Sequence, residues 1–125
     1  MKENTISYDI RGKCFKIYNE LGPGLLESVY EAALEYELGL AGYTVSRQMS
    51  IPMHYKSIKV NTGFRVDLLV ENLVVIEIKS VEMLLDVHYK QLLTYLRLMD
   101  KKLGLLINFN TVNLGRSIIR VVNNL

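Results

Sequence analysis

Apolar residues recur at intervals of three and four through the first third of the chain. This spacing predicts an amphipathic helix over residues 5–20, whose apolar positions are Ile6, Ile10, Cys14, Ile17 and Tyr18. Gly22-Pro23-Gly24 ends this helix, because proline and glycine both interrupt helical hydrogen bonding. A second helix is predicted over residues 25–40, and its expected apolar stripe is Leu26, Val29, Tyr30, Ala33 and Leu34.

From Tyr43 onwards the helical spacing gives way to alternation. Residues 43–55 alternate loosely and contain Pro52, which predicts an edge strand because proline cannot donate to a central ladder. Residues 64–70 and 73–79 form two stronger apolar runs. Glu71-Asn72 separates them, so the sequence predicts a β-hairpin.

The last third of the chain alternates between the two kinds of pattern. Helical spacing returns over residues 82–100, followed by a strand at 103–109 that is apolar on both faces and a short strand at 117–122. The path from strand 73–79 through this helix to strand 103–109 has the length of a parallel crossover. We therefore expect one α/β domain over residues 1–125, with a mixed sheet flanked by helices.

Composition agrees with a folded chain and leaves its partner open. Half of the 125 residues are hydrophobic and 22% are charged, with a net charge of +2, which permits a polyanionic partner without requiring one. Cys14 is the only cysteine, so we expect it to be a core residue, and no internal disulfide is possible. The sequence shows no signal peptide and no membrane span, which favours the cytoplasm and no membrane partner.

Candidate chemistry lies on strand 73–79, where Glu77 and Lys79 share one face. A buried carboxylate and ammonium are costly unless they are paired or bound to a metal. Asp67 on the neighbouring strand would face away after a two-residue turn. An odd-numbered turn or a bulge, with Asn72 in the left-handed region, would set Asp67 opposite Val75 and diagonal to Glu77. We predict the second arrangement.

Two carboxylates and the carbonyl of Ile78 would suit a hard cation such as Mg²⁺ or Mn²⁺. Such an ion would polarise a phosphate, and Lys79 would orient the attacking water or stabilise the developing charge. The spacing alone also fits, and by itself favours, a structural ion pair between Glu77 and Lys79 at the end of the sheet.

The spacing of Asp67, Glu77 and Lys79 resembles the motif of the PD-(D/E)XK nuclease superfamily. Gly24, Glu27 and Tyr30 in "GLLESVY" match the G-x-x-E-x-x-Y signature of the GxxExxY family, a branch of that superfamily. The segments "FRVDLLVENLVVIEIKSV", "QLLTYLRLMDKKLGLLINFN" and "RSIIRVV" are also similar to that family. The resemblance covers residues 5–122.

This resemblance implies a restriction-endonuclease-like α-β-β-β-α-β core and assigns roles within it. Asp67 and Glu77 resemble the metal-binding acids and Lys79 the catalytic lysine, while Glu27 resembles a helix glutamate that supports the metal. Gln91 and Tyr95 form a Q-x-x-x-Y motif; by resemblance Gln91 joins the catalytic set, and Tyr95 and Tyr30 are expected at the substrate. Val66 replaces the proline that usually precedes the first acid.

The residues themselves leave plainer alternatives open for these roles. Glu27 would also suit a solvated position in the first turn of a helix, and Gln91 and Tyr95 would suit the polar margin of an amphipathic helix. The basic residues are scattered along the sequence and indicate no single surface; they are Arg47, Lys56, Lys59, Arg65, Lys90, Lys101 and Lys102.

We expect a Mg²⁺- or Mn²⁺-dependent nuclease acting on nucleic acid, with DNA favoured over RNA. The alternative is a non-catalytic module that keeps the nuclease fold and binds nucleic acid or another protein. A homodimer formed through the apolar last strand is a further possibility.

Overall fold

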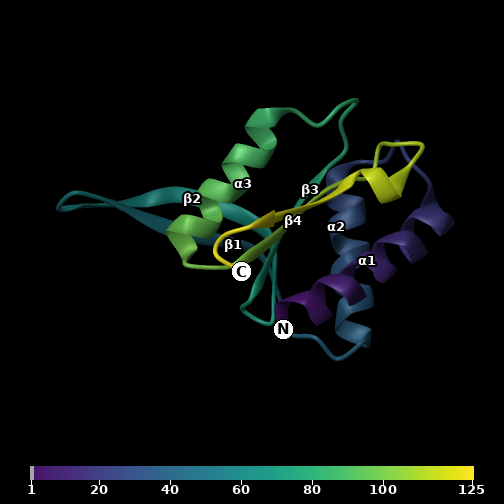
Figure 1. Ribbon diagram of the computed structural model, residues 1–125, viewed down its shortest axis with the longest axis horizontal. Helices are drawn as coiled ribbons and strands as arrows, with labels where there is room; N and C mark the ends of the chain where they lie inside the picture. Colours follow the sequence, from purple (N-terminus) through teal and green to yellow (C-terminus); the bar gives the residue numbers. More distant parts are fainter. Residues whose placement is uncertain (1) are drawn as a thin grey trace.

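The protein is a five-stranded mixed sheet with helices on both faces, as the sequence predicts. The computed structural model describes residues 2–125, apart from the side chain of Thr62. The strands lie in the order β1-β2-β3-β4-β5, with β3 and β4 parallel and the other neighbours antiparallel (Figure 1). The elements are α1 (Lys2–Leu21), α2 (Glu27–Leu40), β1 (Val45–Tyr55), β2 (Ile58–Val70), β3 (Val74–Lys79), α3 (Asp86–Met99), β4 (Leu103–Asn108), the short 3₁₀ helix η1 (Leu114–Arg116) and β5 (Ile118–Val122).

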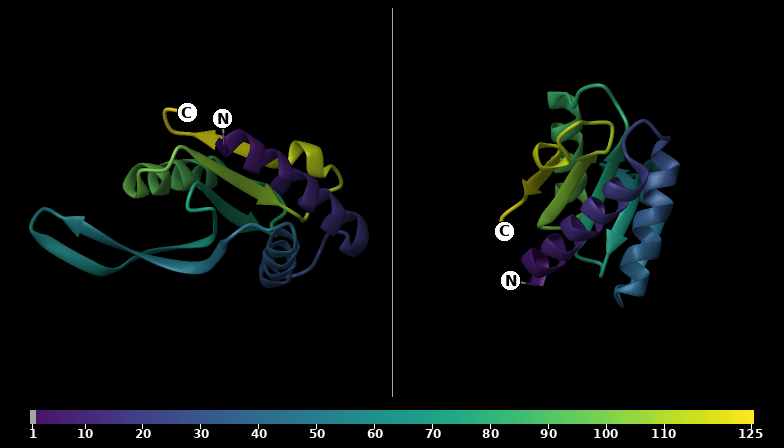
Figure 2. Two further views of the ribbon diagram at one scale, coloured as in Figure 1. Left: turned by 90° about the horizontal axis from the view of Figure 1, so that it is seen from below. Right: turned by 90° about the vertical axis from the view of Figure 1, so that its right-hand side faces the viewer.

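The helices divide the apolar core into two layers. α1 and α2 cover one face of the sheet and α3 covers the other (Figure 2). Every residue of β4 is buried, as are the first five residues of β3, because both strands are covered on each face. Cys14 is a core residue of α1, as expected, and burial raises the pKa of its thiol to about 12. No helix within residues 2–125 is long and apolar enough to cross a bilayer.

Two expectations about the helices are wrong in detail. α3 begins at Asp86 rather than at residue 82, because Leu85 is extended (φ −110°, ψ 159°) and its N–H donates to Nδ1 of His88 at 3.0 Å. In α2 the buried stripe is Tyr30, Glu31, Leu34 and Leu38, whereas Leu26 and Val29 are exposed. The helix is therefore rotated so that a carboxylate faces the sheet.

The β2–β3 turn has the predicted odd number of residues, but its register differs from the expectation. Val70 pairs with Val74, so Glu71, Asn72 and Leu73 lie between the paired residues. Glu71 and Asn72 both have positive φ (55° and 56°), and the Leu73 N–H donates to the Val70 carbonyl at 2.9 Å. The expected pairing of Asp67 with Val75 is therefore wrong, because Val75 pairs with Leu69.

The β1–β2 hairpin is longer than the sequence predicts, since β2 begins at Ile58 rather than at residue 64. Its outer part, residues 51–64, projects beyond the rest of the molecule (Figure 1) and is called the arm below. Residues 58–63 contribute little to the core, so apolar periodicity did not mark them as a strand. The register shifts between Ile51 and Met53, at Pro52, as expected where a strand proline interrupts the ladder.

Gly63 is required by the close approach of the two arm strands at this irregularity. A Cβ atom on Gly63 would lie 2.4 Å from the Ile51 carbonyl oxygen and 2.8 Å from the Met53 nitrogen. We expect Gly63→Ala to lower the free energy of unfolding by about 1–3 kcal/mol, because backbone must move. Gly12→Ala, in open space on α1, should raise it by up to about 1 kcal/mol. Denaturant unfolding measures both, and equal stabilities for Gly63→Ala and wild type would contradict the packing at Pro52.

Candidate active site

Two carboxylates replace backbone carbonyls where the β2–β3 ladder ends. The ladder runs through Val70–Val74, Leu69–Val75 and Leu68–Ile76 and then stops. At the next position the Asp67 N–H donates to Oε2 of Glu77 at 2.9 Å, and the Ile78 N–H donates to Oδ2 of Asp67 at 2.7 Å. Each strand thus satisfies its neighbour's amide with a side chain, and the exchange fixes both carboxylates opposite one another.

Gln48 extends this arrangement from β1 towards α2. Its side-chain nitrogen lies 3.2 Å from Oδ1 of Asp67 and 2.9 Å from each carboxylate oxygen of Glu31. Glu31 is buried and accepts a further hydrogen bond from Nε of Arg47 at 2.8 Å. Gln48 adopts a positive φ of 52°, a conformation that is uncommon for glutamine. Glu31 and Gln48 are not expected at the site from the sequence; the available signal is that Glu31 lies one helical turn after Glu27.

The carboxylate pair is electrostatically unfavourable when no cation is near. Burial, and after it the Asp67 carboxylate, raises the pKa of Glu77 to about 8. Burial also raises the pKa of Asp67, while the hydrogen bond from the Ile78 amide acts in the opposite direction. At neutral pH this pair therefore favours either a shared proton or a bound cation.

Lys79 follows Glu77 on the same face of β3 and is half-buried. Its positive charge lowers the pKa of both carboxyl groups without outweighing burial. Within residues 2–125, however, the ion pairs closer than 4.0 Å involve Lys16 and Arg47, and none joins Lys79 to Glu77. The alternative of a structural Glu77–Lys79 ion pair therefore has no support in this geometry.

Tyr30 has a structural position, which corrects its expected placement at the substrate. Its side chain is completely buried and its ring stacks on Phe109 with the centroids 4.3 Å apart. The hydroxyl donates to the Gly22 carbonyl at 2.7 Å and accepts from the Leu25 N–H at 3.1 Å. Tyr30 therefore holds the loop between α1 and α2, in which Gly24 has a φ of 93°.

The same loop grips the end of β3. The Ser80 hydroxyl donates to the Leu25 carbonyl at 2.6 Å, and the Ser80 N–H lies 3.4 Å from Oε2 of Glu27. Glu27 itself is exposed. Its carboxylate approaches the backbone of Ser80, the residue after Lys79, rather than the Asp67 carboxylate. In residues 2–125 no three His, Cys, Asp or Glu side chains form a group able to hold a metal. The structure thus brings together Asp67 and Glu77 but does not add Glu27 to them.

Tyr95 lies on α3, on the face of the sheet opposite to α1 and α2. Its ring stacks on Phe64 at a centroid distance of 4.2 Å. Its pKa is raised by partial burial and then by the charges of Glu77 and Asp67, so the hydroxyl lies within electrostatic reach of both carboxylates. Gln91 is exposed one turn earlier on α3, and among the described residues no hydrogen bond connects it to the pair.

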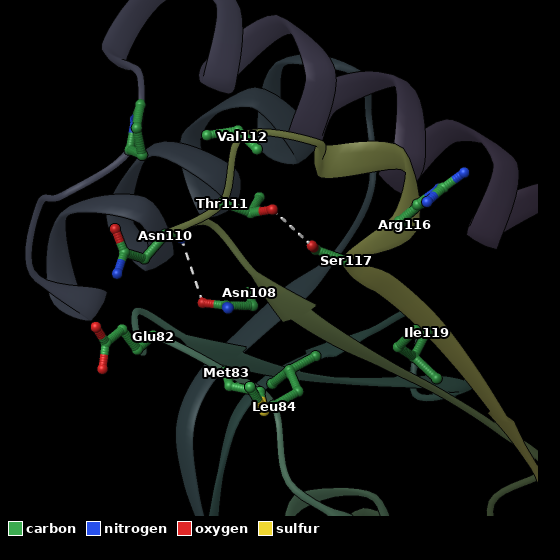
Figure 3. A pocket seen from close by; sticks show the side chains of 11 residues that line it. Glu82, Met83, Leu84, Asn108, Asn110, Thr111, Val112, Arg116, Ser117 and Ile119 are labelled. Atoms are coloured by element: carbon green, nitrogen blue, oxygen red, sulfur yellow. Dashed lines mark hydrogen bonds between the residues drawn. The ribbon is translucent and has the colours of Figure 1, made fainter.

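A cavity of about 570 Å³ lies beyond the carboxyl ends of β3 and β4 (Figure 3). Asn108 lies in its wall and is the β4 neighbour of Lys79. Its side chain is fixed by hydrogen bonds with Val81 and with the Asn110 N–H. The other lining residues come from the loops after β3 and β4, from η1 and β5 and, with Pro23, from the α1–α2 loop; they include Glu82, Thr111, Arg116 and Ser117. The cavity therefore adjoins the end of β3, but neither carboxylate of the pair lines it.

Comparison with known proteins identifies a family. A family model described as the PD-(D/E)XK nuclease superfamily matches residues 4–121. Searches of curated proteins and of solved structures gave no significant match.

The raised pKa of Glu77 gives a prediction for the metal-free protein. A carboxyl group whose pKa is higher in the folded state than in the unfolded state binds more protons when folded. Stability should therefore fall as pH rises from about 4.5 to about 8. In chelator, the free energy of unfolding of Glu77→Gln should exceed that of wild type by at least about 1 kcal/mol at pH 8 and should equal it near pH 4.5. Denaturant titration across this range tests it, and a constant difference would contradict the burial of a charged Glu77.

Proposed function

Because the chain belongs to the PD-(D/E)XK nuclease superfamily, we propose that it hydrolyses phosphodiester bonds in nucleic acid with the help of a divalent cation. The observation that carries this proposal is the reciprocal exchange between β2 and β3, which holds the Asp67 and Glu77 carboxylates opposite one another with Lys79 on the same face as Glu77. A purely structural role would be better served by apolar side chains at these buried and half-buried positions.

The donor set fits Mg²⁺ or Mn²⁺. Asp67 and Glu77 supply oxygen ligands, and the Ile78 carbonyl is a third candidate. Burial and mutual repulsion oppose the charged state of both carboxyl groups, and a cation would relieve that repulsion. When bound, the cation would polarise the scissile phosphate and favour deprotonation of a water molecule. Glu27, next to Ser80, would assist through hydrogen bonds to water.

The remaining steps fall to side chains of this chain. Lys79 would hold the attacking water and stabilise the negative charge that develops on the phosphate. Gln48 would keep the Asp67 carboxylate in one orientation, because its own amide is held by Glu31, which accepts a further hydrogen bond from Arg47. Tyr95 and Gln91 would contact the phosphate backbone from α3.

We also propose that the chain belongs to the GxxExxY branch. The three residues of that signature have connected roles here: Gly24 provides the positive-φ turn, Tyr30 secures the loop from inside the core, and Glu27 meets the backbone at Ser80. Through these contacts the signature residues would fix the position of Ser80 and hence of Lys79, the proposed catalytic lysine. This gives the signature a role in function and not only in forming the helix.

Cleavage of labelled nucleic acid in Mn²⁺ or Mg²⁺ tests the proposed activity. Glu77→Ala and Lys79→Ala should each lower the cleavage rate by about 100-fold or more, because each removes a group that acts on the reacting phosphate. Glu20→Ala and Lys102→Ala, which change exposed residues of the same types, should leave it unchanged. If wild-type protein neither cleaves DNA or RNA nor binds Mn²⁺ in calorimetry, the enzyme is excluded and the non-catalytic module remains.

Replacement of Gln48 should separate its effect on activity from its effect on folding. Gln48→Gly keeps the positive φ without strain but removes the amide between Asp67 and Glu31. We expect a fall in cleavage rate of about 10-fold, with stability close to that of wild type. Parallel rate and unfolding measurements check this, and Gln48→Asn, which tolerates the same backbone region, should be intermediate. An unchanged rate in Gln48→Gly would show that Asp67 needs no support from β1.

A further inference from the structure

Positive charge is concentrated in and around the arm. Residues 47–65 contain four of the fifteen lysine and arginine residues and none of the thirteen acidic residues, which leaves the rest of the chain with eleven cationic and thirteen acidic side chains. Arg47 is paired with Glu31 and Glu35. Among the described residues, no ion pair engages Lys56, Lys59 or Arg65, and all three are exposed. The arm therefore carries two cationic side chains, Lys56 and Lys59, with no acidic residue of its own, and Arg65 follows at its base.

The two faces of the arm differ in chemistry. Met53 pairs with Val60 and Tyr55 with Ile58, and these pairs alternate with His54–Lys59. Cross-strand partners share a face, so one face is apolar and the other carries His54 and Lys59. Tyr55 and Ile58 near the tip are 63% and 60% exposed, and the Lys56 ammonium lies 5.4 Å from the centroid of the Tyr55 ring.

We propose that the arm binds in the major groove of duplex DNA and thereby directs a phosphate to the Asp67–Glu77 pair. This inference rests on the proposed nuclease function for its choice of partner. A two-stranded ribbon fits the major groove, and Lys56 and Lys59 would contact phosphates on the groove's edge. The apolar tip would meet sugars and base edges.

The attachment of the arm places it next to the carboxylates. Phe64, the last residue of the arm, stacks on Tyr95 of α3. Arg65 comes next in the chain and lies two positions before Asp67. The free part of β1, from Ile51 to Tyr55, has a length of about 15 Å at the usual rise of a strand. A duplex held along the arm would therefore run directly past the end of the β2–β3 ladder.

A second copy of the chain fits the arm less well than DNA does. Two arms packed on one another would bring lysines together with no acid to offset them, and like charges across strands are destabilising. A polyanion, by contrast, meets Lys56 and Lys59 with complementary charge.

Binding can be measured without cleavage by using the Glu77→Gln protein in chelator and titrating salt. Lys56→Gln/Lys59→Gln should weaken binding to a labelled DNA duplex by about 10-fold or more and reduce the slope of log K against log salt by about 2. The matched control Lys2→Gln/Lys13→Gln removes the same charge from α1, away from the arm (Figure 1), and should change affinity by less than about 2-fold. Equal weakening by both pairs would overturn the inference, since net charge alone would then explain binding.

Two further comparisons test the identity of the partner. Duplex RNA and single-stranded DNA should bind more weakly than duplex DNA, because the A-form major groove is too deep and narrow for a ribbon; equal arm-dependent binding to either would overturn the groove assignment. Sedimentation should give Tyr55→Ser/Ile58→Ser the same association state as wild type, whereas loss of a dimer would assign the arm to a second copy. Arm-dependent binding without any cleavage by wild type would contradict the proposed activity and leave the arm assignment standing.

Discussion

The exchange of hydrogen bonds between Asp67 and Glu77 across β2 and β3 is the constraint on which the rest of the site depends. A backbone ladder normally pairs amide with carbonyl, yet here each amide is satisfied by a carboxylate from the neighbouring strand. The two carboxylates are consequently held in place by backbone amides of the sheet. This is the arrangement that a reaction needs when its geometry must be fixed before the substrate arrives.

Such a placement is unfavourable in isolation, and the surrounding residues offset it in stages. Burial raises the pKa of both carboxyl groups, so the charged pair destabilises the fold until a proton or a cation is present. Lys79 lowers the pKa of each carboxyl group, and within residues 2–125 no ion pair engages its ammonium, which leaves it able to meet another ligand. Gln48 and Glu31 add a layer that orients Asp67 from the far side, with Arg47 balancing the charge of Glu31. The carboxylate pair therefore lowers the stability of the fold that carries it, as is usual for residues required by function.

The sequence predicted much of the fold because its strands are marked by strong apolar runs. β3 and β4 are buried on both faces, and the positive φ of Asn72 follows from the turn chemistry of asparagine. The odd-numbered turn followed from requiring two carboxylates on one face. The predicted register was displaced by two residues, because Val75 pairs with Leu69 and not with Asp67. Glu31 and Gln48 escaped prediction for different reasons: a glutamate on a helix is usually solvated, and no glycine or asparagine marked the left-handed residue in β1. The second strand of the arm, before residue 64, was also not predicted, because it pairs with β1 and contributes little to the core.

The site and the arm have a common structural origin at Gln48. In a regular strand, residues four apart face the same side. Val45, however, packs with the α1–α2 core and Met49 with the α3 core. On β2 the same change separates Leu68 from Val66, two residues apart. Both strands therefore exchange faces at the level of Gln48 and Asp67, where the positive φ of Gln48 interrupts the pleat. The distortion that brings the amide of Gln48 to Asp67 and Glu31 therefore lies just before the arm begins, so a change that made β1 regular would alter the support of the carboxylates and the path of β1 into the arm together.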